Sequence, residues 1–177
     1  MGTNQVRCER HYEQRYEQWA APLRGRPGVV RALNIVNRGI VVVFYAAYAL
    51  LLGWACVSDP WRLVPLVGVT AVGFVAVSFF RRRFNAPRLY ECCAIAPLIA
   101  RDGAGKSFPS RHAFSAFAIA ASWFAASAPV AVVLLVAAVV LAICRVLGGV
   151  HFPRDVVVGA LIGSATGALA AFLAALL

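Results

Sequence analysis

Long runs of apolar residues follow one another along this chain, with short polar clusters between them. The runs cover residues 39–57, 63–80, 110–127, 129–145 and 154–177. Each approaches the roughly 20 residues that an α-helix needs to cross the ~30 Å hydrocarbon layer of a bilayer. The pattern predicts an all-α integral membrane protein, built as a bundle of about five transmembrane helices. In the last run, glycines recur at four-residue spacing, which predicts a face that packs closely on another helix.

The first 38 residues are polar and do not continue this pattern. Tyr12, Tyr16 and Trp19 recur at helical spacing among glutamate and arginine residues, which predicts an N-terminal amphipathic helix lying on the membrane surface. A solvated helix or a frayed tail explains the same spacing equally well. The segment 24–28 contains two glycines and a proline, so it predicts a break. We therefore divide the chain into a polar N-terminal segment, residues 1–38, and a membrane domain, residues 39–177.

Composition supports a membrane protein and narrows its partners. Hydrophobic residues make up 62% of the chain and charged residues 14%, values that soluble domains of this size rarely reach. The formal net charge is +10. Because the basic residues lie at the ends of the apolar runs, we exclude nucleic acid and expect anionic lipid as the partner. The five cysteines show neither a metal-binding spacing nor a disulfide framework.

Beyond residue 102, ionisable residues are rare, and all of them lie at the ends of apolar runs: Lys106, Arg111, His112, Arg145, His151, Arg154 and Asp155. If successive runs cross the membrane in alternating directions, three polar segments lie at one face of the membrane. These are the end of the second run, the start of the third, and the connection between the fourth and the fifth. Ionisable groups beside a membrane span are costly to bury. The sequence therefore predicts one polar functional site at one end of the bundle.

The basic residues at this end suit a phosphate group. Arg81, Arg88 and Arg145 can converge on one anion, because a guanidinium group can bind two phosphate oxygens at once in a bidentate contact. Lys106 is a further candidate ligand. Ser110 precedes the third run, and the free backbone N–H groups at the start of that helix also favour phosphate. We expect these five residues to bind phosphate.

His151 and Asp155 lie four residues apart at the entry to the last helix. The carboxylate can accept the proton of one imidazole nitrogen and hold the other nitrogen forward, which makes His151 a candidate nucleophile. His112 then remains as the general acid or base. No cluster of histidine, aspartate and glutamate has the spacing of metal ligands, so we expect no metal and no other cofactor.

Three motifs at these positions resemble those of a known family. Arg81-x6-Arg88, Pro109-Ser110-Arg111-His112 and Arg145-x5-His151-x3-Asp155 are similar to Lys-x6-Arg-Pro, Pro-Ser-Gly-His and Ser-Arg-x5-His-x3-Asp of the type 2 phosphatidic acid phosphatase (PAP2) family. That family comprises membrane lipid phosphatases and shares its site with vanadium haloperoxidases. This chain departs from the motifs at four positions, with Arg81 for lysine, Leu89 for proline, Arg111 for glycine and Cys144 for serine.

The resemblance implies a PAP2-like fold and a metal-independent phosphatase. Such an enzyme hydrolyses a lipid phosphate or a polyprenyl diphosphate through a phosphohistidine intermediate. By this resemblance His151 attacks phosphorus, Asp155 orients it, and His112 protonates the leaving oxygen and later activates water. The phosphate is held by Arg81, Arg88, Ser110 and Arg145.

Two alternatives stay open. A lipid phosphotransferase of the same fold would pass the phosphate to another lipid, and an inactive relative would only bind lipid. The complete set of catalytic residues argues against the inactive relative. Candidate substrates are polyprenyl diphosphates such as undecaprenyl diphosphate, phosphatidylglycerophosphate and phosphatidic acid. The motifs do not choose among them, and they do not predict an oligomeric state.

The expected location is the cell membrane, with several spans. The polar N-terminus and the 81–111 connection share one face in a five-span layout, and the N-terminal segment adds positive charge there through Arg24, Arg26, Arg31 and Arg38. The positive-inside rule then favours a site on the cytoplasmic side. The family resemblance favours the outer side, since many bacterial members face outward.

Overall fold

Helices and the loops between them make up the described part of the chain. The computed structural model describes residues 3–99 and 105–177, with side chains from residue 12 onward, and no strand occurs in these ranges. In chain order the helices are α1 (Thr3–Arg24), α2 (Pro27–Ser58), η1 (Pro60–Arg62), α3 (Leu63–Phe84), α4 (Leu89–Cys92), α5 (Arg111–Ser122), η2 (Trp123–Ala125), α6 (Ala128–Leu147) and α7 (Pro153–Ala175). The prediction of an all-α protein is confirmed.

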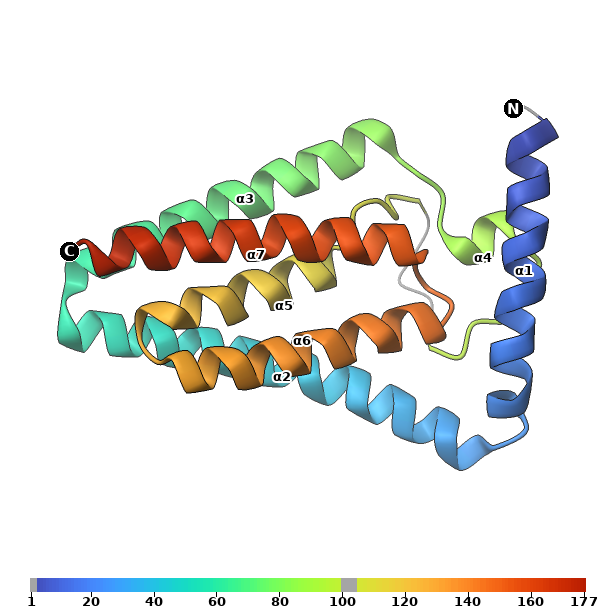
Figure 1. Ribbon diagram of the computed structural model, residues 1–177, viewed down its shortest axis with the longest axis horizontal. Coiled ribbons are helices and arrows are strands. Elements are labelled where there is room, and N and C mark those ends of the chain that lie inside the picture. The colour runs from blue at the N-terminus through green and yellow to red at the C-terminus, as the bar shows by residue number, and fades with distance from the viewer. Residues whose placement is uncertain (1–2, 100–104) are drawn as a thin grey trace.

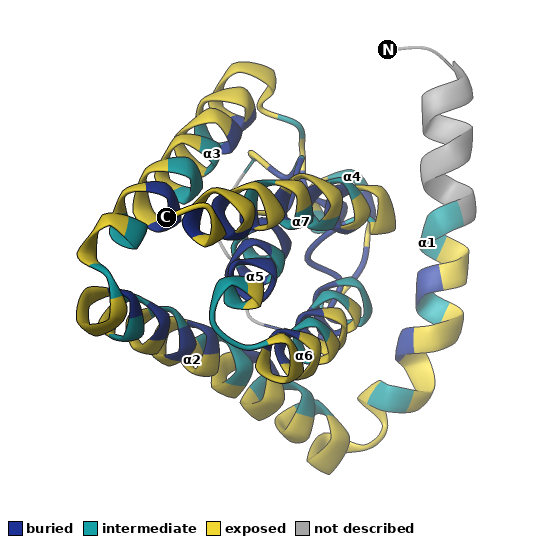
Figure 2. Cartoon of the chain, turned by 60° about the vertical axis from the view of Figure 1, so that its left-hand side comes forward, coloured by how far each residue is buried: buried dark blue, intermediate teal, exposed yellow. Residues whose placement is uncertain are grey.

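Five helices form the bundle, and α5 lies at its centre with α2, α3, α6 and α7 around it (Figure 1 and Figure 2). Within the described residues, four segments are long and apolar enough to cross a membrane, residues 27–58, 60–92, 128–147 and 153–175. The predicted third span corresponds to α5 and η2. With 12 residues α5 is shorter than the other four helices, and most of its residues are buried by those neighbours rather than exposed to lipid.

Small residues let α7 approach α5 closely. Gly159, Gly163 and Gly167 of α7 are buried. A Cβ atom at Gly163 would collide with the backbone carbonyl oxygen of Phe114 in α5, and the other two glycines meet carbonyl groups near α5 in the same way. The predicted close-packing face of the last helix is therefore confirmed, and the helix that packs on it is α5.

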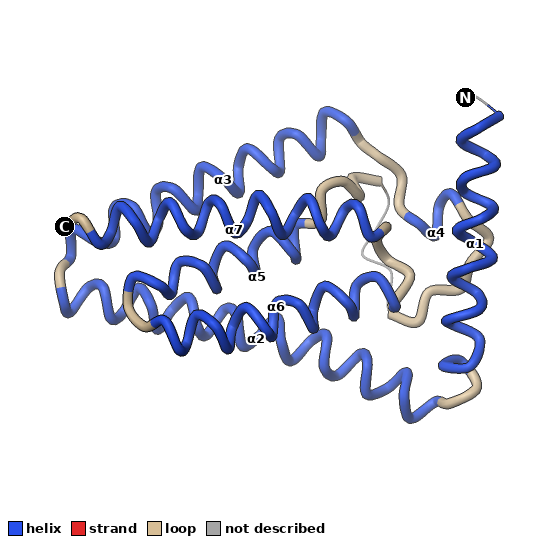
Figure 3. The backbone as a smooth tube through the Cα atoms, in the orientation of Figure 1, coloured by secondary structure: helices blue, strands red, loops and turns tan. Residues whose placement is uncertain are grey.

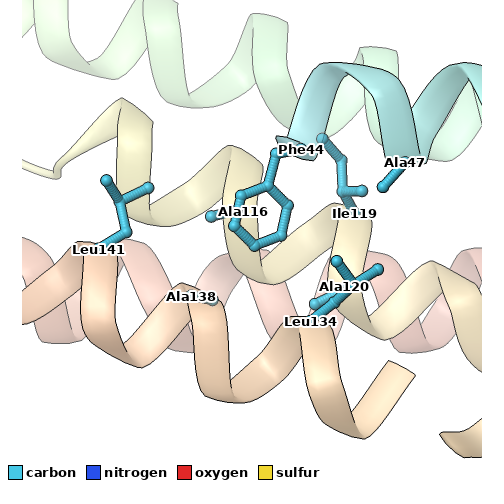
Figure 4. Packing of buried hydrophobic residues seen from close by; sticks show 8 residues of the cluster. All are labelled: Phe44, Ala47, Ala116, Ile119, Ala120, Leu134, Ala138 and Leu141. Carbon is cyan, nitrogen blue, oxygen red and sulfur yellow. The ribbon is translucent and has the colours of Figure 1, made fainter. Parts of the chain in front are cut away.

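A hydrophobic cluster joins α2, α5 and α6 (Figure 4). The cluster includes Phe44 of α2, Ile119 of α5, and Leu134 and Leu141 of α6. The outer faces of the helices are also apolar, and many large hydrophobic side chains are exposed there. In lipid, apolar surface gives no drive for association, so the bundle is stabilised mainly by van der Waals packing of this kind.

α1 lies across one end of the bundle rather than alongside it (Figure 1). The predicted break is confirmed, because α1 ends at Arg24 and α2 begins at Pro27, where proline suits the first helical position. Tyr16 of α1 is buried against α4 and the loop that follows α4. One face of the polar N-terminal helix therefore packs on the protein itself. Residue 38, where we placed the end of this segment, lies inside α2.

The longest connection follows α3 and lies at the same end as α1 (Figure 3). α3 ends where Asn85 adopts the left-handed conformation, with φ of 40°. The connection contains the single helical turn α4, Leu89–Cys92. The Glu91 carboxylate accepts hydrogen bonds from the backbone N–H groups of Arg88 at 2.6 Å and of Gly105 at 3.0 Å, so it joins two distant parts of the connection.

Candidate active site

Buried ionisable side chains gather at the end of the bundle next to α1 and α4. Arg81 lies near the end of α3, Arg145 near the end of α6 and Asp155 in the first turn of α7. Arg88 and His151 lie in the adjoining loops, and all five side chains belong to residues that are at most 5% exposed. The structure thus brings these predicted site residues together, although 64 positions separate the first from Arg145 along the chain.

A serine links the candidate nucleophile to its carboxylate. The Ser107 hydroxyl donates a hydrogen bond to Asp155 Oδ2 at 2.5 Å and lies 3.2 Å from His151 Nδ1. The distance from His151 Nδ1 to Asp155 Oδ2 is 3.6 Å, too long for a direct hydrogen bond. Because the only hydroxyl proton goes to Asp155, Ser107 Oγ can only accept from His151. This assigns the proton of the neutral imidazole to Nδ1 and the free lone pair to Nε2.

The Asp155 carboxylate is held by the start of its own helix. Its Oδ2 atom accepts a hydrogen bond from the backbone N–H of Phe152 at 3.3 Å. The Asp155 main-chain carbonyl accepts from the backbone N–H of Ser110 at 2.9 Å, which ties the start of α5 to the start of α7. The Ser110 hydroxyl accepts from Ala113 N at 3.5 Å, so this predicted phosphate ligand caps α5 here.

Arg81 and Arg88 both hold the loop that carries Ser107. The Arg81 guanidinium donates to the carbonyl oxygens of Ser107, at 3.1 Å, and of Pro109. Arg88 Nε donates to the Gly105 carbonyl at 3.0 Å. A guanidinium has further N–H donors for an anion. In this structure the two predicted phosphate ligands therefore position the loop that carries the serine bridge.

A cavity of 570 Å³ opens beside these arginines, and we call it the cationic cavity. Among the described residues its lining contains no carboxylate, and Lys106, an exposed residue, forms part of its wall. Such a cavity attracts an anion through the summed positive charge of its walls. The lining residues are Phe74, Val75, Ser78, Phe79, Arg81, Arg82, Arg88, Gly105, Lys106 and Arg111.

His112 lies in the first turn of α5 and faces a second cavity, of 220 Å³, which we call the α2–α5 cavity. Most of its lining is apolar, and it comes from α2, α3, α5 and α6. The charges that act most strongly on His112 are those of Arg111, Arg81 and Arg88. His112 therefore lies between a positively charged region and a space suited to hydrocarbon.

Burial keeps the candidate nucleophile unprotonated. Burial lowers the pKa of His151 to about 4, the positive charges of Arg145 and Arg88 act in the same direction, and the nearby Asp155 carboxylate opposes them. At neutral pH the imidazole is neutral, and Nε2 can act as a nucleophile.

The N-terminal helix supports the turn that precedes His151. The Tyr16 hydroxyl donates a hydrogen bond to the Leu147 carbonyl at 3.2 Å, and the Tyr12 ring packs on Phe152 with 5.3 Å between centroids. Gly149 has φ of 73°, and a Cβ atom there would meet the Tyr16 hydroxyl. A glycine is needed at this position for both reasons.

Sequence reasoning missed three residues of this region. Ser107 precedes the second motif by two residues, and a hydroxyl so near Ser110 was the signal that could have identified it. Glu91 lies outside the motifs, and its bonds to the backbone of Arg88 and Gly105 could not be inferred from spacing. The contact of Tyr16 with the turn after α6 has no counterpart in the motifs.

A solved protein structure has a fold similar to that of this chain. The crystal structure of Aquifex aeolicus LpxE matches with a TM-score of 0.59 and 23% identity, covering 81% of this chain and 92% of that chain. The crystal structure of the first transmembrane PAP2 type phosphatidylglycerolphosphate phosphatase from Bacillus subtilis matches with a TM-score of 0.41 and 21% identity, covering 90% of each chain. No curated protein sequence matches.

At these identities the likeness to solved structures concerns the fold alone. The family model described as the PAP2 superfamily matches residues 62–175, which is more than half of the chain and includes all three motifs. This chain therefore belongs to the PAP2 superfamily.

Proposed function

We propose that this protein is a metal-independent phosphatase that hydrolyses a lipid phosphate or a polyprenyl diphosphate through a phosphohistidine on His151. Membership of a superfamily of phosphatases supports a phosphoric ester hydrolase. The observation that carries the proposal is the hydrogen-bonded chain from Asp155 through Ser107 to His151 Nδ1, located at the same end of the bundle as the cationic cavity.

In the first step His151 Nε2 attacks phosphorus, and the bond between phosphorus and the lipid oxygen breaks. The electron pair leaves with that oxygen, which takes a proton from His112. Asp155 acts through Ser107 and stabilises the positive charge that develops on the imidazole. The guanidinium groups of Arg81, Arg88 and Arg145 neutralise the phosphoryl oxygens, a task that metal ions perform in other phosphatases.

In the second step water attacks the phosphohistidine. His112, now neutral, takes a proton from the water, the bond between phosphorus and His151 Nε2 breaks, and inorganic phosphate leaves. The same imidazole thus serves as acid and then as base. This requires His112 to reach both the lipid oxygen and the attacking water, which fits its place between the cationic cavity and the α2–α5 cavity.

The direct test is phosphate release by the purified protein in detergent micelles. Prenyl diphosphate, phosphatidylglycerophosphate, phosphatidic acid and p-nitrophenyl phosphate form the panel. His151→Ala should abolish release from every substrate. His112→Ala should lose about a hundred- to ten-thousandfold on the lipids but much less on the aryl ester, whose leaving group needs no proton. Wild-type rates in folded His151→Ala protein would contradict the proposal.

The same assay separates hydrolysis from phosphotransfer. A hydrolase releases inorganic phosphate in water without an added acceptor lipid. A phosphotransferase of this fold would leave the substrate intact until a second lipid is added, and it would then yield a new phosphorylated lipid.

We also propose that the protein resides in the cell membrane with the site on the cytoplasmic side. The basic residues of α1 and of the α1–α2 turn lie at the site end, since Arg24 donates to the Ala96 carbonyl at 2.8 Å. Cysteines introduced as Arg26→Cys and, at the opposite end, Asp59→Cys test the orientation. In intact cells a membrane-impermeant thiol reagent should label the second variant, and faster labelling of the first would reverse the assignment.

A further inference from the structure

Arg111 is a charged residue of the cationic cavity to which the proposed mechanism assigns no task. It is the first residue of α5, directly before His112, and its side chain is exposed. It also occupies the position at which the family motif has glycine. Among the described residues, two line both the cationic cavity and the α2–α5 cavity, Phe74 and Arg111. The Arg111 side chain therefore lies where the two spaces meet.

The cationic cavity carries more positive charge than one phosphate requires. Arg81 and Arg88 already serve the transferred phosphate in the proposed mechanism, and Arg82, Lys106 and Arg111 line the same cavity. Among the charges that act on Arg81, that of Arg111 has the largest effect, followed by Arg88. Like charges so close repel one another, so an anion between them is strongly favoured. This excess of cations suits a substrate with a second anionic group.

The position of His112 indicates where the second anionic group of the substrate lies. In the proposed mechanism His112 protonates the oxygen that carries the lipid, so the lipid side of the broken bond faces His112. The α2–α5 cavity begins at His112 and continues between apolar side chains such as Phe44 and Leu141, which suits a hydrocarbon chain. Arg111 adjoins His112 in this cavity. It is therefore next to the atoms that connect the lipid to the transferred phosphate.

We propose that Arg111 binds a second phosphate, located between the hydrocarbon chain and the phosphate that is transferred. This inference rests on the proposed function and narrows its substrate class. Two kinds of lipid have such an internal phosphate, a prenyl diphosphate and a glycerophospholipid whose terminal phosphate lies beyond a phosphodiester. Phosphatidic acid has none, because its phosphate is attached directly to the diacylglycerol. A guanidinium matches two oxygens of an internal phosphate in a bidentate contact.

The test measures selectivity in the full-length protein purified in detergent micelles. Arg111→Gln removes the charge and keeps most of the side-chain length. Arg83→Gln is the matched control, because Arg83 is an exposed arginine at the end of α3 that lines neither cavity. The quantity compared is kcat/KM for farnesyl diphosphate and for phosphatidylglycerophosphate, each divided by kcat/KM for phosphatidic acid.

Loss of one charge-assisted contact should lower these ratios about ten- to hundredfold in Arg111→Gln and leave them unchanged in Arg83→Gln. A fall in only one ratio supports the inference and identifies which lipid supplies the internal phosphate. Unchanged ratios in Arg111→Gln overturn the inference but not the proposed function, whether the three rates stay the same or fall together. Wild-type protein that releases phosphate from none of the three lipids overturns the proposed function, and the inference falls with it.

Discussion

Replacing Ser107 with alanine removes the bridge between His151 and Asp155. Its hydroxyl makes a 2.5 Å bond to Asp155 Oδ2 and lies 3.2 Å from His151 Nδ1, in a residue that is 1% exposed. Without it the imidazole proton faces Asp155 across 3.6 Å, and the carboxylate loses a donor. A buried polar group left unsatisfied costs about 1–3 kcal/mol. Since about 1.4 kcal/mol of barrier is tenfold in rate, kcat should fall about ten- to hundredfold.

The assay is phosphate release from a lipid phosphate and from p-nitrophenyl phosphate. Both rates should fall by the same factor, because Ser107 acts through the nucleophile and not through the acid that serves the leaving group. Ser122→Ala is the matched control, since it removes an equally buried hydroxyl from the far part of α5, where Ser122 bonds to the Ala118 carbonyl at 2.9 Å. An unchanged kcat in folded Ser107→Ala protein would refute the bridge.

Three further predictions concern packing, pH and metal. Gly163→Ala should destabilise the bundle by about 1–3 kcal/mol through its collision with the Phe114 carbonyl. Gly53→Ala, whose new methyl group would meet no described atom beyond its own helix backbone within 4 Å, should be neutral or slightly stabilising. Thermal unfolding in detergent compares the two variants, and equal midpoints would contradict the close contact. The pKa of His151 is about 4 in the folded protein and ordinarily ~6.5, so between these pH values the unfolded chain binds more protons than the folded one. The free energy of unfolding should therefore fall as pH drops from about 6.5 to 4, by on the order of 2 kcal/mol at pH 5. A His151→Gln variant should lose less stability on the same acidification, and equal losses would argue against the buried neutral imidazole. Phosphatase activity should survive excess EDTA, because arginine side chains neutralise the phosphate. Activity lost in EDTA and restored by a divalent ion would contradict this assignment. Vanadate should inhibit the enzyme, because it can adopt the five-coordinate geometry of the transition state.

The sequence predicted the overall class and the end of the bundle at which the site lies. Apolar runs of span length are governed by the thickness of the bilayer, which makes helices readable from hydropathy alone. Antiparallel threading then brings chain positions as distant as Arg81 and Arg145 to the same end. The four-residue spacing of His151 and Asp155 predicted that these two residues lie close together, because both are at the start of one helix.

Other features depend on tertiary contacts that no local pattern records. The third apolar run became the short central helix α5, because small residues in α7 let it be enclosed by the other four helices. The spacing of Tyr12, Tyr16 and Trp19 predicted an amphipathic N-terminal helix, but it did not predict that Tyr16 is buried against α4 and the loop that follows it. Ser107 connects His151 to Asp155 through a loop whose path is set by Arg81 and Glu91, and motif spacing carries no information about that path.

The central claim is that phosphate becomes attached to His151. Mixing the purified protein with a lipid labelled with ³²P in its terminal phosphate, followed by rapid quenching, should trap an acid-labile phosphoenzyme. Digestion should locate the label in the peptide that contains residue 151. His112→Ala should accumulate more of the label, because it lacks the base for the second step, and His151→Ala should carry none. Label of undiminished amount in His151→Ala protein would contradict the account.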